Sequence, residues 1–171
     1  MKYTCVKFKT HGLMIFIFIS LMLIFPDIAA ACDPKPHAKK YINQIRDVFG
    51  GEKPGLVIEE DSSEEILAFY DREEKIIHIY KDDYKGSCEE NLPKLRVVIA
   101  HEYAHHLNSK IRKIAPIDGR ENLAETAEHA IANAIWGEDK VVFDDDLNQQ
   151  YLQQYKKIFS HVKSKIIKNR T

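Results

Sequence analysis

RVVIAHEYAHHL, residues 96–107, is the stretch of sequence that decides the fold expected for this chain. Apolar residues before and inside it recur at helical spacing, which predicts an amphipathic helix. The recurring positions are Leu92, Leu95, Val98 and Ile99. Asn91 is the expected N-cap of this helix, and Pro93 is then tolerated in its first turn. The rest of the domain should be built around this helix.

The same stretch contains His101, Glu102 and His105 in the pattern H-E-x-x-H. Histidines four residues apart lie on one helical face, so both imidazoles can reach a single zinc ion at about 2.0–2.1 Å. Glu102 lies beside that ion and can act as the general base toward a metal-bound water. The alternative is a surface helix with solvated histidines, but the apolar surroundings of the pair argue against it.

A catalytic zinc site normally takes three protein ligands and keeps one position open. A second helix, expected from Asp118 to Trp136 and ended by Gly137, carries the candidates for the third ligand. These are Glu121, Glu125, Glu128 and His129, which lie on or near one face. Its many alanines allow it to pack closely on the helix with the two histidines.

Residues 98–136 resemble the gluzincin type of zinc metallopeptidase, in which H-E-x-x-H is followed on a later helix by E-x-x-A-D. Glu121-Asn122-Leu123-Ala124-Glu125 matches that phrase except for its last residue, and Gly119-Arg120-Glu121 is similar to a family of uncharacterised bacterial metallopeptidases. This resemblance implies a zincin fold with Glu121 as the third ligand. It also implies that Glu125 accepts a hydrogen bond from a ligand histidine and fixes its tautomer.

Three other interpretations of the second helix remain open. The spacing of thermolysin-like gluzincins selects Glu125 as the ligand and places His129 behind it. Residues 129–133, HAIAN, resemble the E-x-x-A-N phrase of related peptidases, which makes His129 a ligand instead. Finally, Asp118 and Glu121 have the spacing of a capping box, in which Glu121 turns back to the backbone and binds no metal.

The first thirty-one residues have the composition of a secretory signal peptide. Three lysines precede an apolar stretch from Leu13 to Phe25, and Ala29-Ala30-Ala31 supplies small cleavage-site residues. We therefore expect residues 1–31 to be a targeting segment and residues 32–171 to be a single domain. The protein should be exported, and should be periplasmic or secreted.

Cys32 and Cys88 are the two cysteines that remain once the signal, with Cys5, is removed. Two cysteines in an exported chain favour a disulfide. The alternative is that Ala29-Ala30-Ala31-Cys32 acts as a bacterial lipobox, in which case Cys32 carries a lipid and anchors the protein to a membrane.

The remaining sequence predicts an α+β domain in which a short twisted sheet packs on helices. Further helices are expected at 37–49 and 145–168, and strands at 56–60, 66–70 and 75–80. The formal net charge of −1 gives no reason to expect nucleic acid as a partner.

Together these features predict zinc-dependent hydrolysis of peptide bonds in a peptide or protein substrate. Tyr151 and Tyr155 are candidate donors to the oxyanion if the last helix closes over the cleft, and His78, Tyr80 and Tyr84 are candidate neighbours of the substrate. The alternative from another class is a non-catalytic or weakly catalytic zinc-binding protein that acts by binding a partner.

Overall fold

The computed structural model of the chain describes residues 32–60, 66–137 and 145–171. Residues 31–171 form one compact unit. The predicted signal peptide, residues 1–31, lies outside the described residues. Within the described ranges, no helix combines the length and the apolar character that crossing a membrane requires.

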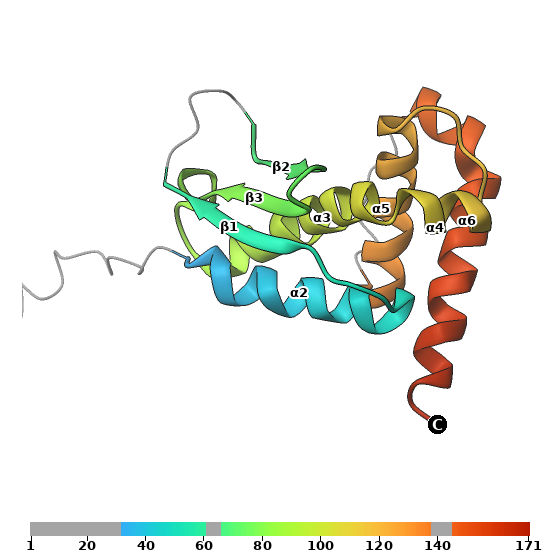
Figure 1. Cartoon of the computed structure of the whole chain (residues 1–171), viewed down its shortest axis with the longest axis horizontal. Coiled ribbons are helices and arrows are strands. Elements are labelled where there is room, and N and C mark those ends of the chain that lie inside the picture. Colours follow the sequence, from blue (N-terminus) through green and yellow to red (C-terminus); the bar gives the residue numbers. More distant parts are fainter. Residues whose placement is uncertain (1–31, 61–65, 138–144) are drawn as a thin grey trace, which may run out of the picture. The chain divides into compact units, whose positions relative to one another are not determined.

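The fold is α+β, as the sequence predicts (Figure 1). The helices, in chain order, are α2 (Pro34–Phe49), the 3-10 helix η1 (Lys81–Tyr84), α3 (Cys88–His106), α4 (Asn108–Ile114), α5 (Glu121–Trp136) and α6 (Asp145–Lys168). The strands are β1 (Gly55–Glu59), β2 (Ala68–Asp71) and β3 (Ile76–Tyr80). The predicted bounds of α6 and the predicted end of α2 are confirmed.

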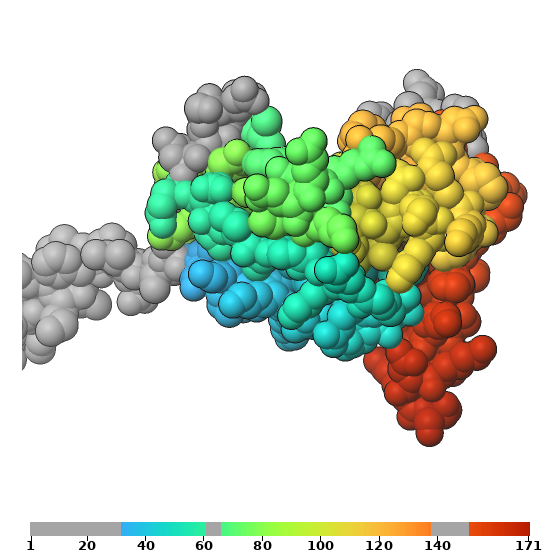
Figure 2. Space-filling view, viewed as in Figure 1, coloured from blue at the N-terminus to red at the C-terminus, as the bar shows by residue number. Residues whose placement is uncertain are grey.

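The three strands form a mixed sheet in the order β1-β3-β2. β3 pairs in parallel with β1 and antiparallel with β2, so β2 is an edge strand. Ile77 and Ile79 of β3 are fully buried, because alternate residues of a strand point to the same face. That face packs against α2 and α3, and the sheet lies above α2 in the view of Figures 1 and 2.

Helix α3 begins three residues earlier than the predicted cap, at Cys88, with Ser87 as its N-cap. The Ser87 hydroxyl accepts a hydrogen bond from the amide of Glu90 at 3.3 Å. The prediction that Asn91 is the N-cap is wrong, because its side-chain amide instead donates to the carbonyl oxygens of Tyr84, Lys85 and Ser87. These bonds fix the loop before α3 to the helix, and Pro93 lies inside the helix.

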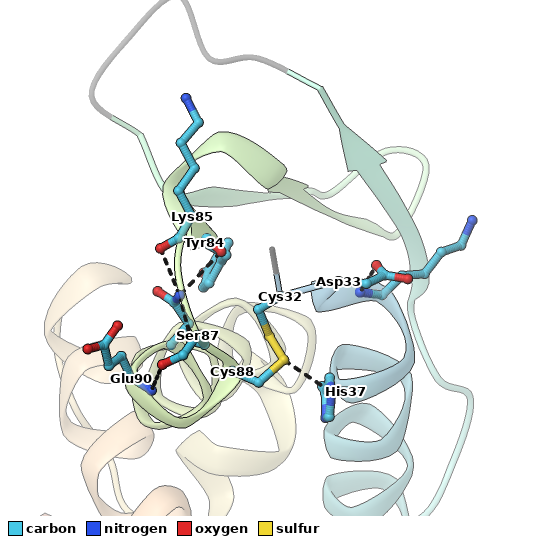
Figure 3. The surroundings of a disulfide bond; sticks show 10 residues. Cys32, Asp33, His37, Tyr84, Lys85, Ser87, Cys88 and Glu90 are labelled. Carbon is cyan, nitrogen blue, oxygen red and sulfur yellow. Dashed lines mark hydrogen bonds between the residues drawn. A yellow bond between two sulfur atoms is a disulfide. The ribbon is translucent and has the colours of Figure 1, made fainter. Parts of the chain in front are cut away.

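Cys32 and Cys88 form the predicted disulfide (Figure 3). It joins the residue before the N-cap of α2 to the first residue of α3, and Cys32 is only 3% exposed. This pairing favours the disulfide over the lipoprotein alternative for Cys32, which stays a prediction. The cellular location of the protein stays a prediction.

Helix α5 packs between α3 and α6 and supplies small side chains to both contacts. Its buried alanines are Ala124, Ala127, Ala130, Ala132 and Ala134. α5 ends where predicted, at Gly137, whose φ of +72° favours glycine. From α6, Ile158 and Val162 are fully buried in the same core.

The loop from Ala115 to Arg120 makes α5 start later than expected. Arg112 of α4 holds this loop, because its guanidinium donates to the carbonyl oxygens of Ile117 and Gly119. Gly119 has a φ of +80°, which fits a sharp turn at this point. The first residue of α5, Glu121, is thereby brought back to the side of α3.

Candidate metal centre

The candidate site lies where α3, the start of α5 and the edge strand β2 meet. α3 contributes His101, Glu102 and His105, and α5 contributes Glu121. The imidazole rings of His101 and His105 are 4.9 Å apart between centroids, as expected for residues one helical turn apart. The predicted pairing of the two histidines on one face is confirmed.

One carboxylate oxygen of Glu121 lies close to both histidines. Its distance is 3.5 Å from Nε2 of His101 and 3.4 Å from Nε2 of His105. Tetrahedral zinc with bonds of about 2.0–2.1 Å holds its ligand atoms about 3.3 Å apart, so these separations fit such an ion. His101, His105 and Glu121 could therefore hold a metal ion. The group contains neither Glu125 nor His129, the two alternative ligands.

Glu121 does not act in a capping box. Arg120 occupies the N-cap position of α5 and makes no side-chain capping hydrogen bond. Glu121 is the first helical residue, whereas a capping box requires the acid at the third. Its side chain is 70% exposed, and within the described ranges its only ion pairs are with the two histidines.

Glu128, rather than Glu125, is the carboxylate behind the histidine pair. Nδ1 of His101 donates to Oε2 of Glu128 at 2.7 Å. A residue seven positions after Glu121 is about 20° from it around a helix, whereas Glu125 is about 40° away on the other side. The prediction that Glu125 fills this role is wrong, and the seven-residue spacing was the signal that could have found Glu128.

The contact with Glu128 fixes the tautomer of His101. With the proton on Nδ1, the Nε2 lone pair is directed to the side of Glu121, where a metal would bind. Burial disfavours the charged imidazole, but the hydrogen bond and negative charge of Glu128 outweigh it and raise the pKa of His101. His129 lies on the other side of Glu128, with its Nε2 3.4 Å from Oε1. His129 thus contacts Glu128 and is not part of the group that could hold a metal.

Glu102 is the most buried carboxylate of the site, with 7% of its surface exposed. Burial raises its pKa to about 7, and the nearby His101 and a hydrogen bond from the backbone amide of Tyr70 act in the opposite direction. His105 behaves differently from His101, because burial and the neighbouring His101 lower its pKa. A carboxylate with a pKa near neutrality is well suited to exchange protons with a substrate.

A cleft of about 350 Å³ opens over these groups. Its walls are the H-E-x-x-H side chains and Glu121 on one side and Ala68, Phe69 and Tyr70 of β2 on the other, with Arg120 at one end. This volume falls within the usual range for ligand sites. The candidate metal centre therefore lies at a cleft that a ligand can enter.

The sequence analysis did not identify Tyr70 as part of the site. Its hydroxyl donates to Nδ1 of His106 at 2.9 Å, and Nε2 of His106 donates to the carbonyl oxygen of Glu52 at 3.0 Å. His106 therefore holds the Tyr70 side chain in place in the cleft wall. Which residue of a short strand faces the active helix depends on strand register, and no local pattern fixes that register.

The tyrosines of α6 do not face the cleft. Tyr151 accepts a hydrogen bond from Asn122 at 3.1 Å, and Tyr155 accepts one from Asn133 at 2.9 Å, so both are engaged with α5. The prediction that one of them supplies an oxyanion donor is not supported. His78 is also outside the cleft, where it contacts Glu59 at 2.9 Å and stacks on Phe69.

A second group with metal-binding side chains lies at the disulfide. Cys32, His37 and Cys88 bring two sulfurs and an imidazole together, with Nε2 of His37 3.9 Å from Sγ of Cys88 (Figure 3). Because the two sulfurs are joined to each other, neither is a free thiolate that could bind a metal. The disulfide therefore accounts for this group.

No family model, curated protein or solved structure matches the chain.

Proposed function

We propose that the protein is a zinc-dependent peptidase whose metal is held by His101, His105 and Glu121. The observation that carries the proposal is the combination of this ligand set with a buried carboxylate, Glu102, at an open cleft. Two imidazoles and one carboxylate form a ligand set typical of catalytic zinc, because three protein ligands leave a position for water or substrate. When bound, zinc would lower the pKa of that water and polarise the scissile carbonyl.

Glu102 is the general base in this proposal. It takes the proton of the attacking water and passes it to the leaving amine. The backbone amide of Tyr70 holds its carboxylate at the cleft, and its burial keeps bulk water from competing for the proton. Glu128 has a positioning role, since it orients His101 through Nδ1.

The position of edge strand β2 supports the proposal that the substrate is a peptide. Among the described residues β2 pairs only with β3, and Ala68, Phe69 and Tyr70 line the cleft. An extended peptide can add to such an edge through main-chain hydrogen bonds. Such an alignment would lay the peptide across the cleft, next to Glu102 and the three ligands.

The test compares the zinc-loaded wild-type protein with Glu102→Gln on a mixed peptide library, with cleavage products identified by mass spectrometry. Glu102→Gln keeps the shape of the side chain but removes the base, so we expect full zinc content and loss of cleavage. Glu125→Gln is the matched control and should cleave like the wild type, because Glu125 is outside the ligand group.

The same experiment tests the non-catalytic alternative. A zinc-bound wild type that cleaves no peptide would favour a protein that acts by binding a partner. Equal cleavage by the wild type and Glu102→Gln would refute the role assigned to Glu102.

A further inference from the structure

A second pocket of about 420 Å³ adjoins the metal cleft. The two share Tyr70, His105 and Arg120 in their walls, so they form one continuous groove. The outer pocket lies between the turn that joins β2 to β3 and the start of α4. In Figure 2 the bright green atoms of this turn lie next to the yellow atoms of the segment from the end of α3 to α4, on the same face of the molecule.

Positive charge dominates the outer pocket. Arg72, Lys75 and Arg120 line it, and none of its described lining residues is an aspartate or glutamate. Within the described parts of the chain, the guanidinium groups of Arg72 and Arg120 make no hydrogen bond or ion pair. Lys75 pairs with Glu52 at 3.2 Å, but both side chains are more than half exposed, so water screens this pair strongly. A concave surface with uncompensated cations attracts anions.

The polar groups of the pocket are also donors. Nε of Arg112 donates to Oδ1 of Asn108 at 2.9 Å, which leaves the NH₂ group of Asn108 to serve as a donor. Ser109 adds a hydroxyl. Guanidinium, ammonium, amide and hydroxyl donors around one pocket suit a carboxylate, which accepts up to about four hydrogen bonds.

The turn between β2 and β3 has a lysine, Lys75, at a position whose backbone conformation other residue types adopt more easily. Lys75 has a φ of +57°, a region that glycine, asparagine and aspartate occupy more readily than lysine. Asp71 stabilises the turn by accepting hydrogen bonds from the amides of Glu73 and Glu74 at 2.8 and 2.9 Å. The turn thus holds Arg72 and Lys75 beside the groove on a hydrogen-bonded backbone.

We propose that this pocket is a specificity pocket for a carboxylate of the substrate, so that the protein selects peptides with an acidic group beside the scissile bond. The proposal rests on the proposed peptidase function and adds the class of substrate to it. The carboxylate belongs either to an acidic side chain or to the C-terminus of the peptide, and the two sources are distinguishable by experiment.

The test measures binding by NMR titration to the zinc-loaded Glu102→Gln protein, in which the peptides stay intact. The probes are acetylated, amidated Ala/Gly hexapeptides in which one glutamate is moved through each position, each matched by a glutamine peptide. A third set carries glutamine and a free C-terminal carboxylate. We expect the carboxylate to bind about 10-fold more tightly than its neutral match at one position, as for a charge-assisted hydrogen bond.

Three variants locate the effect. Arg72→Gln should remove most of the 10-fold preference, and Arg72→Glu should reverse it, so that the glutamine peptide binds more tightly than its glutamate match. Lys156→Gln, an exposed cation of α6, is the matched control and should leave the preference unchanged. Arg72 is exposed and next to no proposed ligand, so a thermal melt and a zinc measurement should show that both Arg72 variants fold and bind metal.

The outcomes separate this proposal from the peptidase proposal. A preference for the glutamate side chain or for the free C-terminus, lost in Arg72→Gln, supports the pocket and identifies the source of the carboxylate. If that preference is present but the wild type cleaves nothing, the peptidase proposal fails and the pocket remains. Equal binding of acidic and neutral peptides, or a preference that Arg72→Glu leaves unchanged, would overturn the proposal even if the wild type cleaves peptides.

Discussion

Replacing Glu102 by glutamine should stabilise the metal-free protein relative to the wild type, and this effect should increase as the pH rises. Burial raises the pKa of Glu102 from 4.5 to about 7, so the folded protein keeps this proton at pH values where the unfolded chain has lost it. Between about pH 4.5 and pH 7 the folded state therefore binds more protons than the unfolded state. Its stability must fall with rising pH over this interval and change no further above it. Glutamine cannot ionise, so Glu102→Gln removes this loss.

The magnitude follows from the two pKa values. They differ by about 2.5 units, and each unit corresponds to about 1.36 kcal/mol, so the ionisation of Glu102 costs about 3 kcal/mol at pH 8. Only 7% of the surface of Glu102 is exposed, so solvent screening reduces this value little. A loss of this size is a substantial part of the stability of an ordinary domain, which is about 5–15 kcal/mol.

Urea unfolding in the presence of a chelator measures the effect. The free energy of unfolding of the wild type, Glu102→Gln and the control Glu125→Gln is determined at pH 5, 6, 7 and 8. The difference between Glu102→Gln and the wild type should grow by about 2–3 kcal/mol from pH 5 to pH 8. Saturating zinc should shrink this growth, because a cation beside the carboxylate favours its ionised form. A difference that stays constant with pH would refute the reasoning.

Three further perturbations test other parts of the structure. Glu121→Ala should weaken zinc binding by more than about 100-fold, because it removes a proposed ligand and losses outside the ligand set cost only about 10–100-fold. Glu125→Ala should leave the affinity nearly unchanged in the same competitive zinc titration, because Glu125 is outside the ligand group and Glu128, not Glu125, contacts His101; a larger effect of Glu125→Ala would move the ligand one turn along α5. Glu128→Gln should weaken zinc binding by about 10–100-fold without changing its stoichiometry, because it disturbs only the orientation of one ligand; wild-type affinity would contradict this positioning role. The double variant Cys32→Ala and Cys88→Ala should lose about 4 kcal/mol of unfolding free energy, because the disulfide closes a loop between residues 56 positions apart; denaturant midpoints equal to those of the wild type would show that the bond adds no stability.

Local patterns predicted the parts of the site that depend on a single helix. The pairing of His101 and His105 and the neighbouring position of Glu102 follow from helical geometry alone. The strand predicted at residues 75–80 is likewise present as β3, and its Ile77 and Ile79 are fully buried. These features need no knowledge of how the elements pack.

Features that depend on packing between elements were predicted less well. Asparagine is a common N-cap residue, but in the fold the side-chain amide of Asn91 donates hydrogen bonds to carbonyl oxygens of the loop before α3. Glu125 and Glu128 lie on nearly the same side of α5, and only the packing of α5 on α3 places Glu128 against His101. Tyr70 enters the site because β2 lies beside α3, which the short strand does not reveal.

The zinc content of the purified protein tests the metal centre most directly. Elemental analysis after exhaustive dialysis is applied to the wild type, His101→Ala, His105→Ala and the control His129→Ala. We expect about one zinc per chain in the wild type and in His129→Ala and a loss of tightly bound zinc in the other two, because each removes one of the three proposed ligands. Equal zinc in all four proteins, or none in the wild type, would contradict the assignment of His101, His105 and Glu121 as the metal site.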